Sequence, residues 1–271
     1  MAEVPRRGAA AWLARLGRSP GLIGAVTVIA LWLLLARTGL VGRTLLADPG
    51  EVLRVFARAL DPAATGRDRI LVHAGGTLGR ALCGWLLAVG LGVLGGVGVG
   101  ARRFLHRGSE PVVDFARAIP PIMVFPLFLV AFNYGDSAYV GTIAFGCVPV
   151  VMLTVGRAMS HVSPAKMEVL QVFGAPRRVR AFAAVMEVVP SCFLGARIAL
   201  SLSLVIAVVT EMVFTPRSGL ALGSLAKDAQ MSFDTPVVYA ALLIVGVFGF
   251  AANALMRVLE ARLGVDAGER L

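Results

Sequence analysis

Residues 77–100 read TLGRALCGWLLAVGLGVLGGVGVG and contain a single charged side chain, that of Arg80. A helix needs about 20 mostly apolar residues to cross the hydrocarbon core of a bilayer, so this stretch is long enough to span a membrane. Its glycines include two pairs at small-xxx-small spacing, Gly92/Gly96 and Gly96/Gly100, which let helix backbones approach closely. The spacing predicts tight helix packing, either within one subunit or between two subunits.

The rest of the chain has the same apolar character. Of its 271 residues, 58% are hydrophobic and 15% are charged, whereas soluble domains carry about 45–50% and about 25%. This composition excludes an ordinary soluble enzyme and a disordered protein. Six apolar stretches are candidate spans, at about 22–36, 77–100, 119–132, 138–155, 192–214 and 236–255. We therefore predict an all-α polytopic membrane protein. Its first stretch is expected to be a retained span rather than a signal peptide, because no A-x-A-like cleavage site follows it.

The net charge of +10 comes from 26 Lys and Arg against 16 Asp and Glu. Because these cations lie between apolar runs, they favour orientation in a membrane over binding of nucleic acid. Sixteen of the 26 fall in the N-terminal segment, the loops near 101–117 and 157–181, and the C-terminal tail. The positive-inside rule then predicts that both termini are cytoplasmic. The stretch at 37–69 on the opposite side is also basic, although it holds four acidic residues. It weakens the difference in positive charge between the two sides of the membrane without reversing it.

We expect three regions along the chain. Residues 1–70 comprise a cytoplasmic tail, the first span and a short amphipathic outer helix at 49–60. In that helix Asp48 is a candidate N-cap, Pro49 suits the first helical position, and four apolar residues form one stripe. The stripe consists of Val52, Val55, Phe56 and Leu60. Residues 71–260 form the core domain with a cytoplasmic loop at 157–185, and residues 261–271 form a C-terminal cytoplasmic tail.

The third candidate span contains three prolines, Pro120, Pro121 and Pro126. Proline removes a backbone donor and kinks a helix. A kinked helix is tolerated in a membrane where neighbours or a water-filled cavity satisfy the freed carbonyls. We therefore expect this span to line a cavity rather than to face lipid.

The loop at 157–185 carries the segment SPAKMEVLQVFGAPRRVR, residues 163–180. Ser163 is placed to cap a helix that starts at Pro164, and Gly174 followed by Pro176 is a typical helix stop. The apolar residues of this helix exceed what a free loop needs: Met167, Val169, Leu170, Val172 and Phe173. An exposed apolar helix requires a partner, which is either another subunit or the chain's own spans.

The spacing from Glu168 to Gly174 resembles the EAA loop of ABC importer permeases, in which a Glu is followed six residues later by Gly. Stretches across about residues 40–256 resemble, in order, motifs of the nitrate/sulfonate/taurine branch of these permeases. They are Leu46-Ala47-Asp48-Pro49, Thr77-Leu78-Gly79-Arg80 with Gly84, Ala118-Ile119-Pro120-Pro121 with Pro126-Leu127, Asn133-Tyr134-Gly135, Pro190 with Gly195-Ala196-Arg197, and Glu211 with Ser218-Gly219-Leu220. The chain departs from the pattern where Val169 and Leu170 replace the two alanines, Met186-Glu187 replaces the closing Leu-Pro, and Ala221 replaces the last glycine of G-L-G.

The resemblance implies a type I ABC importer-like permease fold and a transport subunit of the bacterial cytoplasmic (inner) membrane rather than an enzyme. The implied cargo is a small solute such as a sulfonate, taurine, nitrate or a related small anion or nutrient. The implied partners are a cytoplasmic ATP-binding subunit, an extracytoplasmic substrate-binding protein, a second permease copy and the lipid bilayer. ATP would be bound by the ATPase subunit, since the chain has no G-x-x-x-x-G-K-[ST] motif and we expect no cofactor in it.

The resemblance also implies two groups of site residues. The expected ATPase-coupling residues are Glu168, Val169, Val172, Phe173, Gly174 and Ala175. The expected substrate-pathway residues are Pro120, Met123, Asn133, Thr210 and Glu211. For Glu211 the alternative is a structural hydrogen bond or ion pair, because an ionisable group in a membrane needs a cavity or a partner. We expect Arg80 to anchor at lipid headgroups, and Arg197 to reach headgroups or pair with Glu187.

Two other classes of protein remain open. A stand-alone secondary transporter or channel would work without an ATPase and would show internal repeats or several buried ionisable groups. A membrane-embedded enzyme would need clustered catalytic groups, whereas His73, His106 and His161 show no ligand spacing. The three cysteines, Cys83, Cys147 and Cys192, are scattered in apolar runs and predict neither a disulfide nor a metal site.

Overall fold

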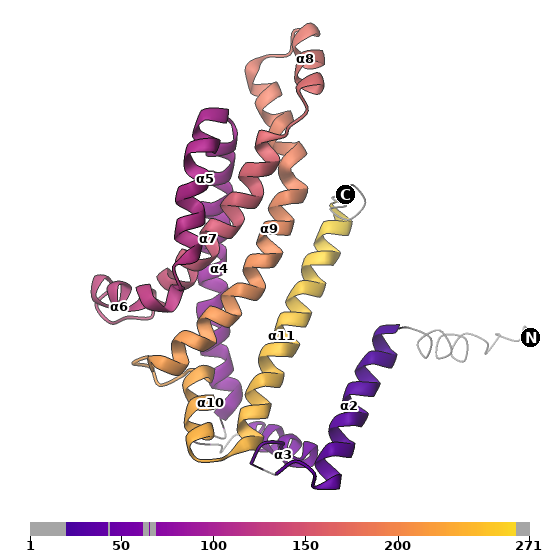
Figure 1. Ribbon diagram of the computed structural model, residues 1–271, viewed down its shortest axis with the longest axis vertical. Coiled ribbons are helices and arrows are strands. Elements are labelled where there is room, and N and C mark those ends of the chain that lie inside the picture. Colours follow the sequence, from indigo (N-terminus) through magenta and orange to yellow (C-terminus); the bar gives the residue numbers. More distant parts are fainter. Residues whose placement is uncertain (1–19, 43, 62–64, 66–68, 264–271) are drawn as a thin grey trace, which may run out of the picture.

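The computed structural model describes residues 20–42, 44–61, 65 and 69–263, and within these ranges the chain is helical without strands. Figure 1 shows the helices as a bundle of long elements with shorter ones at its ends. The helices are α2 (Pro20–Thr38), α3 (Pro49–Ala59), α4 (Ile70–Gly100), α5 (Arg103–Ala118), α6 (Pro121–Ala131), α7 (Ser137–Ser160), α8 (Pro164–Val172), α9 (Arg177–Val213), α10 (Leu222–Met231) and α11 (Thr235–Arg262).

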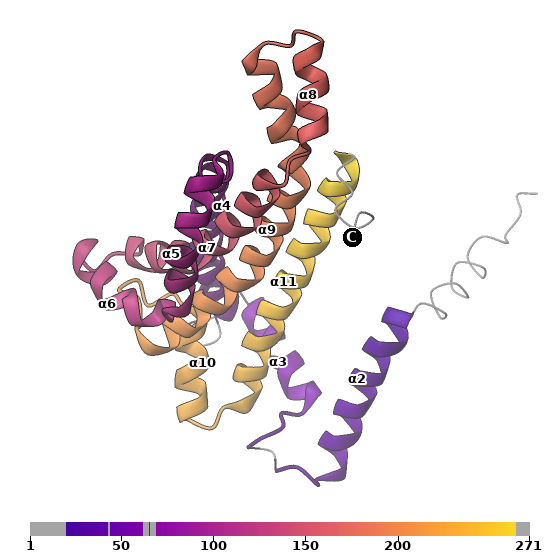
Figure 2. The ribbon, with the colours of Figure 1, turned by 45° about the horizontal axis from the view of Figure 1, so that its top comes forward.

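Four described helices, α4, α7, α9 and α11, are long and apolar enough to cross a membrane. Helices α4, α7 and α9 pack against one another, and α11 lies beside α9, as Figures 1 and 2 show. Helix α2 contains a shorter apolar segment, Ile23–Thr38. The predicted spans thus correspond to the four long helices, to α6 and to the shorter α2, and the all-α polytopic prediction is confirmed.

The glycine-rich face of α4 packs on α7. A Cβ atom at Gly92 would lie 2.6 Å from Val151 Cβ, and one at Gly96 would lie 2.8 Å from the carbonyl oxygen of Met152. A Cβ at Gly100 would lie 2.5 Å from the carbonyl oxygen of Gly156. The two small-xxx-small pairs therefore serve helix packing within the chain, which decides between the two possibilities left open by the sequence.

The third predicted span, at 119–132, corresponds to α6 alone, and the expectation of a loop at 101–117 is wrong, because helix α5 occupies most of that segment. Helices α5 and α6 pass the length requirement together, with a 90° bend between them. The bend falls at consecutive prolines, because a residue that precedes proline is driven out of the helical region. Ile119 and Pro120 accordingly have extended ψ angles of 119° and 124°. Helix α6 alone has 11 residues, which is too short to cross a bilayer.

The fifth span is much longer than its apolar run at 192–214. Helix α9 is continuous over 37 residues and passes through Pro190. It begins at Arg177, so the last part of the expected loop at 157–185 is helical. Helix α8 lies at the N-terminal end of α9, at the top of Figure 1.

Helix α3 forms where the sequence predicts it. The Asp48 carboxylate accepts a hydrogen bond of 2.7 Å from the backbone N–H of Gly50, and Pro49 is the first helical residue. Val52 and Val55 are buried in a cluster with residues of α10 and α11. The placement of Leu60 on this stripe is wrong, because Leu60 is the C-cap, where the helix has ended, and it is 74% exposed.

Candidate functional site

The first candidate site is the exposed surface of α8, which we call the coupling face and define as Glu168, Val169, Val172, Phe173, Gly174 and Ala175. Helix α8 buries no residue. The side chains of Val172 and Phe173 are 84% and 82% exposed, and that of Val169 is 54% exposed. In both views α8 stands at one end of the bundle (Figures 1 and 2). These apolar residues are therefore not covered by the chain's own spans.

A glycine in the left-handed conformation closes α8. Gly174 has a φ of +71°, and the N–H of Ala175 donates to the carbonyl of Leu170 at 2.9 Å. The N–H of Gly174 donates to the carbonyl of Gln171 at 3.0 Å. These two bonds form a Schellman motif, the typical helix end at a left-handed glycine. At the start of α8, Ser163 is the N-cap as predicted, although its side chain makes no capping hydrogen bond.

Two polar contacts attach α8 to α9. Lys166 Nζ lies 3.3 Å from Glu187 Oε1, and Arg180 Nη1 donates to Gln171 Oε1 at 3.0 Å. Glu187 is one of the two residues that depart from the expected Leu-Pro, and its carboxylate pairs with Lys166 on α8. Of the two alternatives for Arg197, the pair with Glu187 is wrong: Arg197 Nη1 instead lies 3.2 Å from Glu260 Oε2 on α11, a partner close in space but distant in sequence.

The second candidate site lies near the other end of α9 and is centred on Arg80, whose side chain is only 6% exposed. We define the Arg80 cluster as Thr77, Arg80, Asp136, Glu211 and Ser218. Arg80 Nη1 donates to Glu211 Oε1 at 2.8 Å, Nε donates to Asp136 Oδ1 at 3.1 Å, and Nη2 donates to Ser218 Oγ at 2.9 Å. The expectation of a headgroup anchor is wrong, because this guanidinium binds protein groups on three sides.

Glu211 is fully buried, with 0% side-chain exposure. Besides Arg80, its carboxylate accepts a hydrogen bond of 2.6 Å from Thr77 Oγ1 and one of 3.2 Å from the N–H of Gly223. A buried charge is stable only when it is paired and hydrogen-bonded, and this set of donors meets that condition. The geometry therefore gives Glu211 the structural ion pair that the sequence left as its alternative role.

The Arg80 cluster fastens the connection between α9 and α10 to α4. The carbonyl oxygen of Leu220 accepts a hydrogen bond of 3.0 Å from Arg80 Nη1, and the N–H of Leu222 donates to Thr77 Oγ1 at 2.8 Å. The Leu220 carbonyl lies so close to Gly76 that a Cβ there would clash with it. This connection and α4 consequently form one tightly packed unit.

The sequence itself contains a signal for this cluster. Arg80 and Glu211 are opposite charges within otherwise apolar spans, and such residues face a partner because lipid solvates them poorly. Thr77 and Arg80 are three residues apart, so they share one face of α4. A pairing between the two spans was therefore available as a hypothesis.

The other expected pathway residues are placed apart. Thr210 is 1% exposed and adjoins Glu211 on α9, and its hydroxyl makes no hydrogen bond with the described residues. Pro120 and Met123 are exposed at the start of α6, where Met123 is 73% exposed. Asn133 is exposed in the turn that follows α6. The structure thus brings Glu211 near this turn through Arg80 and Asp136, and leaves Pro120 and Met123 at the opposite end of α6.

An aromatic group supports α6 beside the Arg80 cluster. Phe125 is 0% exposed, and its ring centroid lies 4.7 Å from that of Tyr139 and 4.6 Å from that of Phe214. The Tyr139 hydroxyl donates to the carbonyl of Phe214 at 2.8 Å, and Arg80 Cζ lies 5.4 Å from the centroid of the Tyr139 ring. Helices α4, α6, α7 and α9 therefore meet at one hub.

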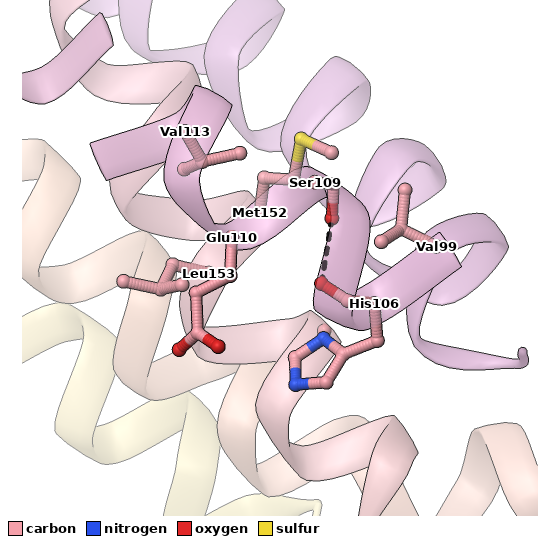
Figure 3. Close-up of a pocket in the computed structure, with 8 residues that line it drawn as sticks. Val99, His106, Ser109, Glu110, Val113, Met152 and Leu153 are labelled. Carbon is pink, nitrogen blue, oxygen red and sulfur yellow. Dashed lines mark hydrogen bonds between the residues drawn. The ribbon is translucent and has the colours of Figure 1, made fainter. Parts of the chain in front are cut away.

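A small pocket lies among α4, α5 and α7, away from both sites (Figure 3). Its lining residues are Val99, His106, Ser109, Glu110, Val113, Met152, Leu153 and Gly156. Ser109 Oγ donates to the carbonyl of His106 at 3.1 Å, and Glu110 pairs with Arg157 at 3.1 Å. None of the expected pathway or coupling residues lines this pocket. Among the residues that the structure describes, no group of His, Cys, Asp and Glu is placed to hold a metal ion.

Comparison with known proteins identifies a family across most of the core. The family described as "Binding-protein-dependent transport system inner membrane component" matches residues 88–265. A putative aliphatic sulfonates transport permease protein of Bacillus subtilis (strain 168) is 26% identical, over 92% of this chain and 88% of that protein.

Two further relatives match at nearly full length. The taurine transport system permease protein of Escherichia coli (strain K12) is 24% identical over 91% of this chain and 90% of its own length. A nitrate import permease protein of Leptolyngbya laminosa is 24% identical over 91% and 88%. Among solved structures, a chain of the MetNI methionine ABC transporter in inward facing conformations superposes with a TM-score of 0.52 at 18% identity, covering 70% of this chain and 93% of that chain.

Proposed function

This chain belongs to the binding-protein-dependent transport system inner membrane component family, and from that premise we propose how it works as the permease subunit of an ABC importer. It is a multi-pass protein of the inner membrane and a transport subunit that works with ATPase and substrate-binding partners. We propose that two copies form the translocation pathway, that the ATPase subunits alone bind and hydrolyse ATP, and that a substrate-binding protein delivers the solute.

The proposed cargo is a small solute: a sulfonate, taurine, nitrate or a related small anion or nutrient. The support is the group of relatives named for transport of aliphatic sulfonates, taurine and nitrate, each of which aligns with about nine tenths of this chain. A panel of these solutes, tested with the cognate binding protein, would identify the cargo.

The main structural support for a permease that works with an ATPase subunit is the exposed coupling face. Val172 and Phe173 leave most of their apolar surface in solvent, and burying a Val or Phe side chain is worth about 1.5–3 kcal/mol. We propose that these two residues enter a groove of the ATPase subunit, while Glu168, Gly174 and Ala175 fix the shape of the contact. Positive charge follows at the start of α9, close to α8 in the sequence, from Arg177, Arg178 and Arg180.

This coupling role fixes the proposed orientation. The α8 end of the bundle is placed in the cytoplasm together with both termini, in agreement with the excess of Lys and Arg in those segments. The Arg80 cluster then lies toward the outer face. We propose that Pro120, Met123 and Asn133 contribute exposed groups to the pathway or to the second permease copy, and that Thr210 and Glu211 support its wall.

The first test targets the coupling face and includes a matched control. The double variant Val172→Ser/Phe173→Ser should lose co-purification of the ATPase subunit in detergent and should abolish uptake. The control is Val112→Ser/Phe115→Ser on α5, where the original side chains are 67% and 70% exposed. Equal retention of the ATPase by both double variants would refute the coupling role, and uptake without any ATPase would favour a secondary transporter.

The second test targets the left-handed turn that ends α8. A Cβ atom added at Gly174 would have open space around it, so a substitution there tests the φ of +71° rather than steric fit. Gly174→Val is expected to uncouple ATP hydrolysis from uptake, because a β-branched residue strongly disfavours φ > 0. Gly174→Asn should retain most uptake, because Asn tolerates this conformation. Equal uptake by the Val and Asn variants would show that the turn is not needed for coupling.

A further inference from the structure

The turn between α6 and α7 holds two non-glycine residues at positive φ, one of them in a conformation that it does not favour. Asn133 and Tyr134 have φ angles of 51° and 60°. Asn133 closes α6 in a Schellman motif, a place where Asn is common. Tyr134 is a bulky residue at positive φ, which is unusual and requires support from its surroundings. That support includes Arg217, whose Cζ lies 5.5 Å from the centroid of the Tyr134 ring.

Asp136 ends this turn and is the N-cap residue of α7. An N-cap Asp commonly accepts hydrogen bonds from the first N–H groups of its own helix. Here the Asp136 side chain makes no such bond, and its backbone is helical, with φ −59° and ψ −23°. Its carboxylate accepts instead from Arg80 Nε at 3.1 Å. Asp136 therefore has two possible sets of donors, of which the structure shows one in use.

The two carboxylates that bind Arg80 differ in how easily they can leave it. Glu211 is 0% exposed, whereas Asp136 is 57% exposed. Breaking a buried pair leaves an uncompensated charge in a low dielectric, so the contact of Arg80 with Glu211 is durable. Water can replace Arg80 as the partner of the Asp136 carboxylate, and Arg80 keeps its bonds to Glu211 and Ser218, so the contact with Asp136 is the one that can open.

We propose that Asp136 is a positioning residue of the transport cycle, whose carboxylate alternates between Arg80 and the N–H groups that begin α7. When it binds Arg80, the turn at 133–136 is held against α4. When it is released, the turn relaxes and α6, which joins directly to it, is free to shift relative to α4 and α9. This inference rests on the proposed function to the extent that α6 lies beside the pathway.

The test is the accessibility of Ala138, a buried residue directly behind the turn with 0% exposure. Ala138→Cys is introduced into a chain whose three native cysteines are replaced by serine. Its rate of reaction with a maleimide is measured in the detergent-solubilised complex of permease and ATPase, with and without a non-hydrolysable ATP analogue. Both faces are open to the reagent in detergent, so the readout does not depend on the proposed orientation.

Asp136→Asn keeps the ability to cap α7 and removes the charge that Arg80 attracts. We expect it to raise the labelling rate by up to about fivefold, the upper end for a salt bridge with one exposed partner, and to abolish the difference between the nucleotide-free and nucleotide-bound states. Asp136→Glu keeps the charge that Arg80 attracts and should therefore keep the slow labelling rate. The control is Asp114→Asn, which removes an exposed pair with Arg117 (3.5 Å, side chains 53% and 45% exposed) and should leave labelling unchanged.

An unchanged labelling rate in Asp136→Asn, or an equal rise in Asp136→Glu, would overturn the inference. Failure of Asp136→Asn to assemble would also overturn it, because Asp136 would then be a structural residue. The proposed function has a separate readout in uptake. If labelling changes as expected while no tested anion is transported, the cargo assignment fails and the role of Asp136 stands.

Discussion

The packing of α4 on α7 predicts that an alanine substitution will have opposite effects on stability at two glycines that lie two residues apart on α4. A Cβ at Gly96 would lie 2.7 Å from Val155 Cβ and 2.8 Å from the carbonyl oxygen of Met152, whereas nothing lies within 4 Å of a Cβ at Gly98. Gly96→Ala and Gly98→Ala therefore add the same methyl group to the same helix in opposite environments.

The magnitudes follow from two opposing effects. In a helix interior Ala is favoured over Gly by about 0.8–1.0 kcal/mol, and both variants gain this. Overpacking a well-packed site costs about 1–3 kcal/mol, and only Gly96→Ala incurs that cost, because the Met152 carbonyl cannot move without a shift of α7. Gly98→Ala should therefore be about 1 kcal/mol more stable than the parent chain. Of the two variants, only Gly96→Ala should be less stable than the parent chain, because its overpacking cost exceeds its gain in helix propensity.

Thermal unfolding of the purified permease in detergent measures this difference. For a chain of this size about 1 kcal/mol corresponds to roughly 2–4 °C in Tm. Gly98→Ala should unfold a few degrees above Gly96→Ala, and uptake should fall in the latter alone. If Gly96→Ala unfolds at or above the temperature of Gly98→Ala, the close contact between α4 and α7 does not exist in the protein and the reasoning from it fails.

Three further predictions concern charges and a helix cap. Arg80→Met and Glu211→Leu should each destabilise the permease by about 3–5 kcal/mol. The double variant should be more stable than either single variant, since no buried charge is then left unpaired. Unfolding midpoints of the parent chain, the two single variants and the double variant measure this double-mutant cycle. Arg197→Ala should cost about 1–3 kcal/mol because it removes the 3.2 Å contact to Glu260, which is 8% exposed, and a Glu260→Gln background should reduce that loss. Asp48→Ala should cost about 1 kcal/mol through loss of the α3 cap and should speed amide exchange in α3, with exchange in α11 unchanged.

The sequence predicts local features of this chain well. The apolar runs identify the long helices, and Asp48 with Pro49 marks the start of α3 because N-cap chemistry depends on adjacent residues alone. The limits of α8, between Ser163 and Gly174, follow from the same kind of local signal. The resemblance to ABC importer permeases, drawn from several weak motifs in order, is confirmed by the family that matches residues 88–265.

Features that depend on distant residues were missed. The partner of Arg80 is a residue 131 positions away, and the partner of Arg197 is on another helix, so neither follows from helical spacing. Residues 101–117 were expected to form a cytoplasmic loop, whereas the structure has helix α5 over most of them. Hydropathy does not register that two consecutive prolines force extended backbone between α5 and α6. The first residues of α9 were expected to belong to the loop at 157–185, because they include three arginines and are separated by Pro190 from the apolar run at 192–214. A helix can extend through such a segment once it continues a long apolar helix.

The unbroken length of α9 has a mechanical consequence. Its 37 residues extend about 55 Å at 1.5 Å per residue, nearly twice the roughly 30 Å of a bilayer core. One end is pinned by Glu211 to Arg80, and the other carries α8. If α9 swings as a rigid rod about the pinned end, a tilt of about 5° displaces the far end by about 5 Å, close to the pitch of one helical turn. A small rotation near one membrane surface would then become a displacement of side-chain size at the other. With the proposed coupling role of α8, α9 would be a long lever on which the ATPase subunits act.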